Sequence, residues 1–464
     1  MITMKFGGTS VGDIQRLQEV ASIIQTYLPL KPAVIASAMS GITDMLLETA
    51  QLSLRREMDA VRRNFETIKD KHQTVADALL KDPARKKELI AHESRLFDDL
   101  DNLFNGVGLL KELSVRSLDA IAAHGEMLSC LQIAAFLNEN GIAAQFIDSR
   151  KIVRTDNRFG EAVVDFTVTN ESIRKTLLPL IDQKVIPVVT GFIGSTEDGL
   201  TTTLGRSGSD YTASIVGAAT ASSEIWIWTD VDGVMTADPR FVKGARVLSA
   251  ISYREAAEMS YFGAKVIHPK TMLPAIDRNI PIRIKNTFNP SHEGTLISLN
   301  TPRTDRVVKN VTSIDRLGLI SIEGNGMLGV PGVSARIFTS LAKVGVNVMM
   351  ISQASSEHNV CLVIPEIDSI RAIETLQHEF RSDISKKAID DIKLQNDVSI
   401  IAVVGEEMKG TRGIAGKTFS ALAQADINVV AIAQGSSELN ISLVVEQKDT
   451  PKAVQAIHDA FLEL

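Results

Sequence analysis

The strongest constraint in the sequence is an internal repeat in its last third. A shift of 81 residues lays Gly332–Val363 over Gly413–Val444 without gaps, and 14 of the 32 positions are identical. Each copy has the pattern of a strand, a helix, two strands and a second helix. Repetition at this period predicts two copies of one small α+β module, at about 315–395 and 396–464.

The two modules are expected to exchange a strand. The first copy begins with the apolar run Leu319–Glu323 and a helix near Val333–Lys343, and Ala388–Leu394 can supply its final strand. The second copy stops on a helix and lacks such a strand. We therefore expect residues 306–314, upstream of both copies, to complete the sheet of the second module and to interleave the two.

Residues 1–300 predict a different architecture. Short β-branched runs alternate with amphipathic stretches, which is typical of an open, mostly parallel α/β sheet with helices on both faces. Residues 45–140 are interpreted as a helical insertion that is rich in charge from Arg55 to Glu112, and these charge runs are expected to be solvated faces. A Pro, Gly, Ser and Asn cluster at 289–305 predicts the linker to residues 301–464. The strand candidates are Ile2–Phe6, Ala33–Ala38, Gln145–Ile147, Val185–Thr190, Ile225–Thr229 and Ile280–Lys285.

Composition argues against two classes of partner. The formal net charge is −7, from 49 basic and 56 acidic residues, so we expect neither nucleic acid nor a membrane surface as partner. No stretch approaches the roughly 18 uninterrupted apolar residues of a membrane span. The two distant cysteines and an N-terminus without the layout of a signal peptide predict a cytoplasmic protein.

Two motifs resemble nucleotide-binding loops but are weak. Gly324, Gly326 and Gly329 match G-x-G-x-x-G, yet the repeat has Glu407 where the central glycine should stand. We interpret this segment as a strand-to-helix turn. Gly416-Lys417-Thr418 resembles the end of a phosphate-binding loop, but Thr411 replaces its first glycine, so a helix surface is the better interpretation.

Three turns rich in small residues follow predicted strands and indicate an anion site. They are Lys5-Phe-Gly-Gly-Thr-Ser10, Ser37-Ala-Met-Ser-Gly-Ile-Thr-Asp44 and Leu204-Gly-Arg-Ser-Gly-Ser-Asp210. Each is expected to open a helix, with Ser10 and Asp13 at the spacing of a capping box in the first. Helix starts with nearby lysine and arginine favour a phosphate and a carboxylate at the carboxyl edge of one sheet.

These motifs together resemble the aspartokinases of the amino-acid kinase family. The further matches are Gly125-Glu126, Thr201–Asp210, Trp228–Val234, Asp238-Pro-Arg240 and Phe262–Pro269, and the repeat resembles the paired ACT modules of that family. The sequences of these motifs most resemble those in the kinase portion of bifunctional aspartokinase–homoserine dehydrogenases. The resemblance implies an amino-acid kinase domain at 1–300, two ACT modules at 301–464 and, here, no dehydrogenase domain.

The resemblance implies transfer of the ATP γ-phosphoryl group to the side-chain carboxylate of L-aspartate. It places Lys5 between the reacting groups, with Gly7 and Gly8 as backbone donors and Asp210 orienting Lys5 or the phosphates. The acceptor carboxylate is ionised at pH 7, so no general base is needed. Mg²⁺ is expected to arrive on ATP, without a dedicated metal site.

Substrate contacts also follow from the resemblance. Arg206 matches the arginine that binds the α-carboxylate, and Glu126 matches the acceptor of the α-ammonium, although a helix-surface role for this glutamate fits the residue alone equally well. Hydroxyl contacts are expected from Thr43, Thr203 and Ser209. The nucleotide positions are Thr229, Asp230, Met235, Arg240 and Lys265, with Met235 where the family usually has Tyr. Trp226 and Trp228 are expected in the core.

The ACT modules imply inhibition by an end-product amino acid bound between modules, usually across a homodimer or higher oligomer. Repeated polar residues are the candidate contacts, although duplicated structural roles are an equal alternative. The resemblance favours threonine over lysine as effector. The competing hypotheses are a different kinase of this family, acting on glutamate or a nucleotide monophosphate, and a non-catalytic amino-acid sensor. The candidate effector residues are Asn347, Gln353, Ser355, Asn428, Gln434 and Ser436.

Overall fold

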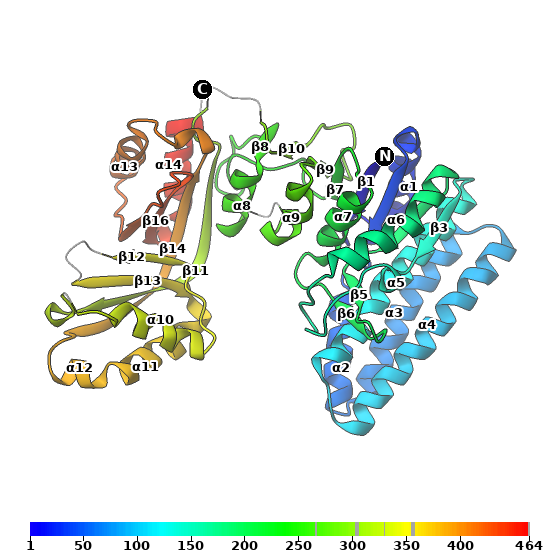
Figure 1. The fold of residues 1–464 in the computed structure, drawn as a ribbon, viewed down its shortest axis with the longest axis horizontal. Helices are drawn as coiled ribbons and strands as arrows, with labels where there is room; N and C mark the ends of the chain where they lie inside the picture. The colour runs from blue at the N-terminus through cyan, green and yellow to red at the C-terminus, as the bar shows by residue number, and fades with distance from the viewer. Residues whose placement is uncertain (265–266, 302–305, 329, 354–357, 463–464) are drawn as a thin grey trace. The chain divides into compact units, whose positions relative to one another are not determined.

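The computed structural model describes residues 1–264, 267–301, 306–328, 330–353 and 358–462. The chain divides into two compact units (Figure 1). The first contains Met1–Val234, Ser249–Tyr253 and residues 267–301, and the second contains Met235–Leu248, residues 254–264 and the described residues after 305. The expected border at residue 300 is therefore too simple, because two earlier segments pack with the second unit.

The first unit is built on an eight-stranded sheet in the order β3-β4-β2-β1-β7-β9-β10-β8. All neighbouring pairs are parallel except β9 and β10, as expected for a mostly parallel α/β sheet. The strands are β1 (Ile2–Phe6), β2 (Pro32–Ala36), β3 (Ala144–Ile147), β4 (Ile186–Thr190), β7 (Ile225–Thr229), β8 (Ala250–Ser252), β9 (Ile282–Asn286) and β10 (Thr295–Ser298). A separate hairpin is formed by β5 (Ile193–Ser195) and β6 (Thr201–Thr203).

Six of these strands match the runs expected from the sequence, whereas β8 and β10 were not expected. Strand β10 lies inside the segment that we interpreted as a linker, so that interpretation is wrong for residues 295–298. The Gly and Pro residues around it belong to the turn after β9, from which the chain returns antiparallel to β9.

Helices cover both faces of this sheet. Successive side chains of β1 point alternately to the two faces. Met4 and Phe6 join a core with residues of α1 (Ile14–Thr26) and α5 (Val115–Glu139). Trp226 and Trp228 lie in the same core, as expected. The opposite face packs against α6 (Phe166–Asp182) and α7 (Gly208–Ala219), so Lys5 points toward α7.

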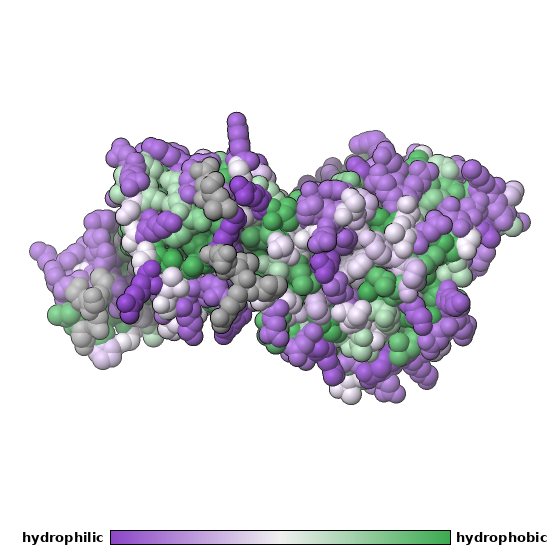
Figure 2. Space-filling view, turned by 90° about the horizontal axis from the view of Figure 1, so that it is seen from above, coloured by the Kyte–Doolittle hydropathy of each residue, from purple (hydrophilic) through white to green (hydrophobic). Residues whose placement is uncertain are grey.

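Residues 42–139 form four helices: α2 (Ile42–Leu54), α3 (Met58–Leu79), α4 (Pro83–Leu110) and α5, with α3, α4 and α5 adjacent (Figure 1). Helix α5 is long and apolar enough to cross a membrane, but 83% of its most apolar window is buried inside the structure, as in a core helix. The interpretation of residues 45–140 as an insertion is therefore wrong for α5, which packs on the sheet. Figure 2 shows hydrophilic residues spread between hydrophobic ones on the visible face.

The second unit contains an antiparallel six-stranded sheet in the order β12-β13-β11-β14-β16-β15. Its strands are β11 (Asn310–Glu323), β12 (Met350–Gln353), β13 (Asn359–Pro365), β14 (Asp391–Val404), β15 (Ala431–Ala433) and β16 (Asn440–Glu446). Its helices are α10 (Val333–Lys343), α11 (Ser369–Glu379), α12 (Arg381–Ser385), α13 (Ile414–Gln424) and α14 (Thr450–Leu462).

Strand β11 serves both modules. Asn310–Ile314 pairs with Ile400–Val404, whereas Leu317–Glu323 pairs with β13 and with the first half of β14. The register shifts between the two halves of β11. Residues 310–314 thus lie beside the second copy and residues 317–323 lie in the first, which is a physical exchange of strands between modules.

Gly324 of the G-x-G-x-x-G match and its repeat equivalent Gly405 both lie where another segment of the chain passes close to the backbone. A Cβ atom at Gly324 would lie 2.4 Å from the Ala388 carbonyl oxygen, and one at Gly405 would lie 2.1 Å from that of Val307. Each glycine lets the chain that leads into a strand of its own module's sheet approach closely, so the two positions are packing sites in a strand-to-helix turn. Gly329 lies outside the described residues. Lys417 and Thr418 lie within α13, as the helix interpretation expected.

The segments 235–248 and 254–264 are bound to β11 and its surroundings. The Val311 N–H donates to the Thr236 carbonyl at 2.9 Å, and the Asn310 side chain donates to the Met235 carbonyl at 2.9 Å. Glu255, on α8 (Tyr253–Tyr261), forms a buried ion pair with Lys309 at 3.1 Å. These contacts explain why both segments belong to the second unit.

Candidate active site

The centre of the site is an ion pair at the carboxyl edge of the first sheet. Lys5 is the fourth residue of β1 and only 9% exposed, and its ammonium lies 2.6 Å from Asp210 Oδ1. Asp210 stands in the first turn of α7, on the sheet face toward which Lys5 points. A lysine ammonium that donates one N–H to a carboxylate keeps two N–H groups with which it can bind an anionic ligand.

Two of the three turns that were predicted to open a helix lead directly into one. Gly41 precedes α2, and Ser207 precedes α7 in a left-handed conformation (φ 55°). The first turn differs, because Asp13 caps α1 by accepting from the Arg16 N–H, and α1 begins six residues after Gly8. The expected capping box of Ser10 and the helix start at Gly7 and Gly8 are therefore wrong.

The glycine pair also differs from the expectation in its hydrogen bonds. The Gly7 N–H donates to the Trp228 carbonyl at 3.3 Å, so this donor extends the pairing of β1 with β7. The Gly8 carbonyl accepts from Ser40 N–H at 3.2 Å, which joins the first turn to the second. The two turns thus form one rim beside Lys5.

A cavity of about 520 Å³ opens at this edge and joins most of the predicted acceptor-binding residues. It is lined by charged and hydroxyl side chains from β1, α2, α5 and the start of α7. The lining residues are Lys5, Ser37, Thr43, Glu126, Gly160, Phe192, Gly205, Arg206, Ser207, Gly208, Ser209 and Asp210. The ion pair therefore faces the same cavity as two further charged residues, the exposed Arg206 and the buried Glu126.

Glu126 is the most perturbed acid in the cavity. Its side chain is buried, and desolvation raises its pKa to about 8, opposed only in part by a backbone hydrogen bond from Ala38. The Oε2 atom has no hydrogen-bond partner in the described structure. A buried carboxyl with an unused oxygen facing a cavity is suited to a cationic group.

Thr203 differs from its predicted role. Its hydroxyl donates to Asp119 Oδ1 at 2.8 Å, and its side chain is buried outside the cavity lining. The expected hydroxyl contact with substrate is therefore replaced by a contact with a carboxyl group on α5. Sequence reasoning missed Asp119, since an aspartate inside an apolar helix gives no sign of its partners.

Two non-glycine residues of the cavity wall have left-handed backbones. Phe192 has φ 70° and Ser207 has φ 55°, a conformation that costs about 1 to 3 kcal/mol outside glycine. The Phe192 N–H is fixed by the Thr212 hydroxyl at 3.0 Å. Eleven other non-glycine residues of the described chain also have positive φ, so this conformation alone does not identify the site, and no motif in the sequence predicts it.

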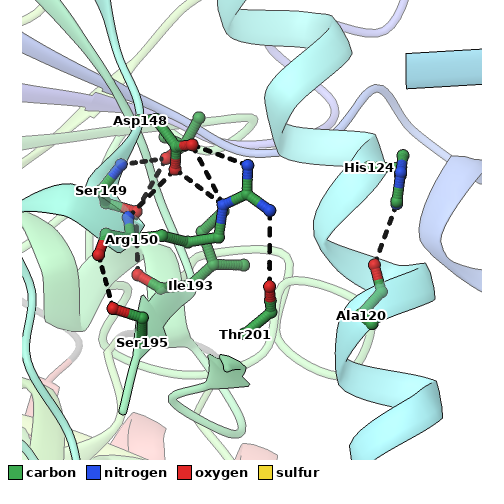
Figure 3. Close-up of polar contacts among 9 residues, drawn as sticks. Ala120, His124, Asp148, Ser149, Arg150, Ile193, Ser195 and Thr201 are labelled. Carbon is green, nitrogen blue, oxygen red and sulfur yellow. Dashed lines mark hydrogen bonds and ion pairs between the residues drawn. The ribbon is translucent and has the colours of Figure 1, made fainter. Parts of the chain in front are cut away.

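The hairpin beside the cavity is held by a polar network (Figure 3). Asp148, directly after β3, binds the Arg150 guanidinium through two oxygens, with the closest pair at 2.7 Å. Arg150 donates to the Thr201 hydroxyl on β6 at 3.4 Å. His124, on α5, is fixed by the Ala120 carbonyl at 2.9 Å, and burial lowers its pKa.

The predicted nucleotide residues fall in different parts of the structure. Thr229 ends β7 beside β1, and its hydroxyl donates to the exposed Asp230 at 3.1 Å. Met235 and Arg240 belong to the second unit, where Met235 is half-buried and Arg240 is 80% exposed and paired with Asp238 at 2.5 Å. Lys265 lies outside the described residues.

The predicted effector residues are found at module loops. Gln353 ends β12 and lines a cavity of about 320 Å³ in the first module, together with Met327, Val330, Pro331, Gly332, Val333, Ser334 and Val360. Asn347 and Asn428 are exposed at equivalent positions, and Gln434 and Ser436 are exposed after β15. Ser355 lies outside the described residues.

Comparison with known proteins agrees with this arrangement. The amino acid kinase family model matches residues 1–286, and the ACT domain model matches residues 320–380 and 401–461. The chain is 34% identical over 467 residues to aspartokinase 3, chloroplastic, of Arabidopsis thaliana, covering 99% of this chain and 81% of that protein. The chain therefore belongs to the amino acid kinase family and, within it, to the aspartokinases.

Two further similarities define the extent of the match. Bifunctional aspartokinase/homoserine dehydrogenase 1, chloroplastic, of Arabidopsis thaliana is 38% identical over 466 residues, which cover 98% of this chain and 50% of that protein. The chain thus spans about half the length of such relatives. Escherichia coli aspartokinase III, solved in complex with aspartate and ADP, matches with a TM-score of 0.82 and 30% identity over all of both chains.

Proposed function

We propose that the protein is an aspartate kinase that transfers the γ-phosphoryl group of ATP to the side-chain carboxylate of L-aspartate. The observation that carries this proposal is the single cavity that joins the Lys5–Asp210 pair with Arg206 and Glu126. The similar aspartokinase III was solved with aspartate and ADP, which supports the same ligands here.

An α-amino acid fits the charges at the cavity wall. The Arg206 guanidinium can bind an α-carboxylate through two parallel hydrogen bonds. Glu126, when ionised, can accept the α-ammonium through the oxygen that has no partner. Thr43 and Ser209 line the same space and can add hydroxyl contacts. The side-chain carboxylate of the acceptor then extends toward Lys5.

The reaction needs positioning and positive charge, because the nucleophile is already ionised at pH 7. An acceptor carboxylate oxygen forms the new bond to the γ-phosphorus, the bond to the bridging oxygen of ADP breaks, and ADP leaves with that electron pair. Lys5 can stabilise the negative charge on the transferring group. Asp210 holds the Lys5 ammonium in place.

Mg²⁺ fits as an ion that the nucleotide brings, since it prefers phosphate oxygens with one or two carboxylates. Asp210 is the carboxylate of the cavity that could face it. Within the described residues, no group of three His, Cys, Asp or Glu side chains could hold a metal ion. When bound, the ion would neutralise phosphate charge. On the nucleotide side, Thr229, Asp230, Met235, Arg240 and Lys265 remain proposed contacts of ATP.

We further propose feedback inhibition by threonine, with lysine as the alternative effector, in the amino-acid pathway that begins from aspartate. The first-module cavity supports an amino-acid site, because Gln353 can donate to a carboxylate and accept from a hydroxyl or ammonium. The similar aspartokinase III has been solved with lysine and aspartate, which supports an amino-acid effector.

A homodimer or higher homo-oligomer through the ACT modules and a cytoplasmic location also remain proposals. The outer strands β12 and β15 contact each other through a hydrogen bond of 2.8 Å from the Ser352 hydroxyl to the Ile432 carbonyl, and they expose Ile351 and Ile432 at 48% and 44%, which supports association through this sheet. Light scattering with and without threonine tests the first of these. The free thiols Cys130 and Cys361 are consistent with a reducing compartment.

The catalytic proposal is tested by trapping the product. An acyl phosphate reacts with hydroxylamine to give a hydroxamate, so the purified protein should yield ADP and a hydroxamate from ATP and L-aspartate. A panel of glutamate, asparagine and D-aspartate separates this acceptor from its relatives.

A further inference from the structure

The carboxyl group of Asp119 lies behind the cavity wall and contacts two segments that form it. Asp119 is 3% exposed on α5. Its Oδ2 accepts from the Gly160 and Thr203 N–H groups, both at 2.9 Å, and its Oδ1 accepts from the Thr203 hydroxyl at 2.8 Å. A buried carboxyl that accepts three hydrogen bonds holds its donors firmly, because losing one leaves a buried polar group unpaired.

The two bound segments are neighbouring walls of the acceptor cavity. Gly160 lines the cavity, and Thr203 leads through Leu204 to Gly205 and Arg206, which also line it. The Ala162 N–H donates to the Thr203 carbonyl at 2.9 Å, so the segments contact each other directly. Gly205 has a left-handed backbone (φ 80°) against Gly160, which turns the chain sharply toward Arg206.

Helix α5 connects this anchor with the opposite wall. Glu126 follows Asp119 by seven residues, which is two turns of an α-helix, so both side chains stand on the same side of α5 about 10 Å apart along its axis. Asp119 therefore ties the segment that carries Arg206 to the helix that carries Glu126.

The three successive threonines of β6 are all used as anchors. Thr201 accepts from Arg150, as Figure 3 shows, Thr202 shares a hydrogen bond with Thr155 at 2.7 Å, and Thr203 binds Asp119. The Asp119 contact is the one nearest to Arg206 along the chain. It also has two short hydrogen bonds, at 2.9 and 2.8 Å, compared with a single contact of 3.4 Å at Thr201.

We infer that Asp119 is a positioning residue that fixes the spacing between Arg206 and Glu126 and thereby sets the affinity and selectivity for the acceptor amino acid. This inference rests on the proposed function, since Arg206 and Glu126 are assigned to the two ends of that amino acid. Asp119 itself does not line the cavity and contacts no reacting atom.

The test is a kinetic comparison of Asp119→Asn and Thr203→Val with the wild-type full chain. The amide replaces one accepting oxygen by a donor that faces an N–H group, and valine removes one of the three hydrogen bonds. Because misplacement of a binding group by about 1 Å can cost about 100-fold, we expect KM for L-aspartate to rise about 10- to 100-fold in Asp119→Asn. The rise should be smaller in Thr203→Val, and kcat and KM for ATP should stay near wild type in both.

Glu93→Gln is the matched control. Glu93 is also a buried carboxyl in a helix, is 2% exposed and accepts from Gln132 at 2.7 Å, but it does not line the cavity. We expect all three of its kinetic constants to be unchanged. An unchanged KM for aspartate in both test variants, or equal losses in KM for aspartate, KM for ATP and kcat, would overturn the inference. If Asp119→Asn does not fold, Thr203→Val decides alone.

Hydrogen exchange separates this inference from the proposed function. The Gly160 and Thr203 amides should exchange faster in Asp119→Asn, whereas those of the Gln132 region should not. If the wild type forms no hydroxamate from L-aspartate, the proposed function fails, and KM for whichever amino acid the wild type phosphorylates replaces KM for aspartate. Unchanged exchange at both amides contradicts the anchoring role whatever the acceptor.

Discussion

Lys5 and Asp210, which are 205 positions apart in the sequence, place their charged atoms 2.6 Å from each other at the edge of the first sheet. If Lys5 stabilises the transferring phosphoryl group, Lys5→Ala should lower kcat about 100- to 1000-fold, which is the usual effect of removing one hydrogen-bond donor to a transition state. Circular dichroism should remain that of the wild type. Steady-state ADP release measures the change.

A second lysine–aspartate pair provides the control for this prediction. Lys86 and Asp77 are also 2.6 Å apart but lie on the surface of the helical region, with Asp77 61% exposed. Lys86→Ala should leave kcat at the wild-type value. Equal kcat values for Lys5→Ala and the wild type would remove Lys5 from the mechanism.

Arg206 should determine the affinity for the acceptor. Arg206→Lys keeps the charge but loses the paired donors, so KM for L-aspartate should rise about 10- to 100-fold, since a hydrogen bond to a charged group contributes about 1.5 to 3 kcal/mol. Arg283→Lys is the control, because Arg283 makes a two-point contact with Glu224 elsewhere in the unit. A similar KM increase in both variants would show a general effect on the fold.

Glu126 should make acceptor binding depend on pH. Its pKa of about 8 keeps the carboxyl protonated near pH 7, whereas binding of an ammonium requires the carboxylate. The affinity for L-aspartate should therefore increase as the pH rises from 6.5 to 8, and calorimetry in two buffers should detect proton release at pH 7. In Glu126→Gln the affinity should be low and nearly independent of pH. A wild-type affinity that does not change with pH would contradict this role.

The same group should affect stability in the opposite direction. Since the pKa of Glu126 is raised from about 4.5 to about 8 on folding, the unfolded state binds fewer protons between these values, and the free energy of unfolding should fall as pH rises through this window. Glu126→Gln lacks this loss. Urea unfolding should show the variant gaining stability relative to wild type from pH 5 to pH 8, by a few kcal/mol at about 1.4 kcal/mol per pKa unit. A constant difference would disprove the shift.

The effector proposal can be tested at the first-module cavity. Gln353→Ala should weaken inhibition by threonine about 10-fold or more, because the bound amino acid would lose a hydrogen-bond partner. The twin residue Gln434 is exposed, as Gln353 is, and Gln434→Ala shows whether the second copy also contributes. Inhibition by lysine alone would reject threonine, and unchanged inhibition in both variants would place the effector elsewhere.

Much of the fold could be predicted because the responsible signals are local. The 81-residue repeat gave the two modules, and the position of 306–314 upstream of both copies pointed to the strand pairing of Asn310–Ile314. The residues that interact over long distances were harder. The sequence predicts a linker at β10 because the four residues of this strand lie among turn formers, and the strand depends on pairing with β9 and β8.

The sequence predicts the charged residues of the site but not the residues that hold them in place. Lys5, Arg206 and Glu126 lie in family motifs. The anchoring by Asp119, the backbone of Phe192 and the hydrogen bond from the Gly7 N–H to the Trp228 carbonyl depend on contacts that no motif contains. Thr203 was assigned to substrate for its hydroxyl, and the structure gives that hydroxyl to Asp119. A hydroxyl near a motif does not reveal which side of the strand it faces.

The measurement that tests the account most directly is hydroxamate formation by the purified protein with ATP, Mg²⁺, hydroxylamine and L-aspartate. We expect ADP and aspartyl hydroxamate in equal amounts, with little product from D-aspartate or glutamate and none from Lys5→Ala. ADP release without hydroxamate, or hydroxamate formed equally well by Lys5→Ala, would contradict it.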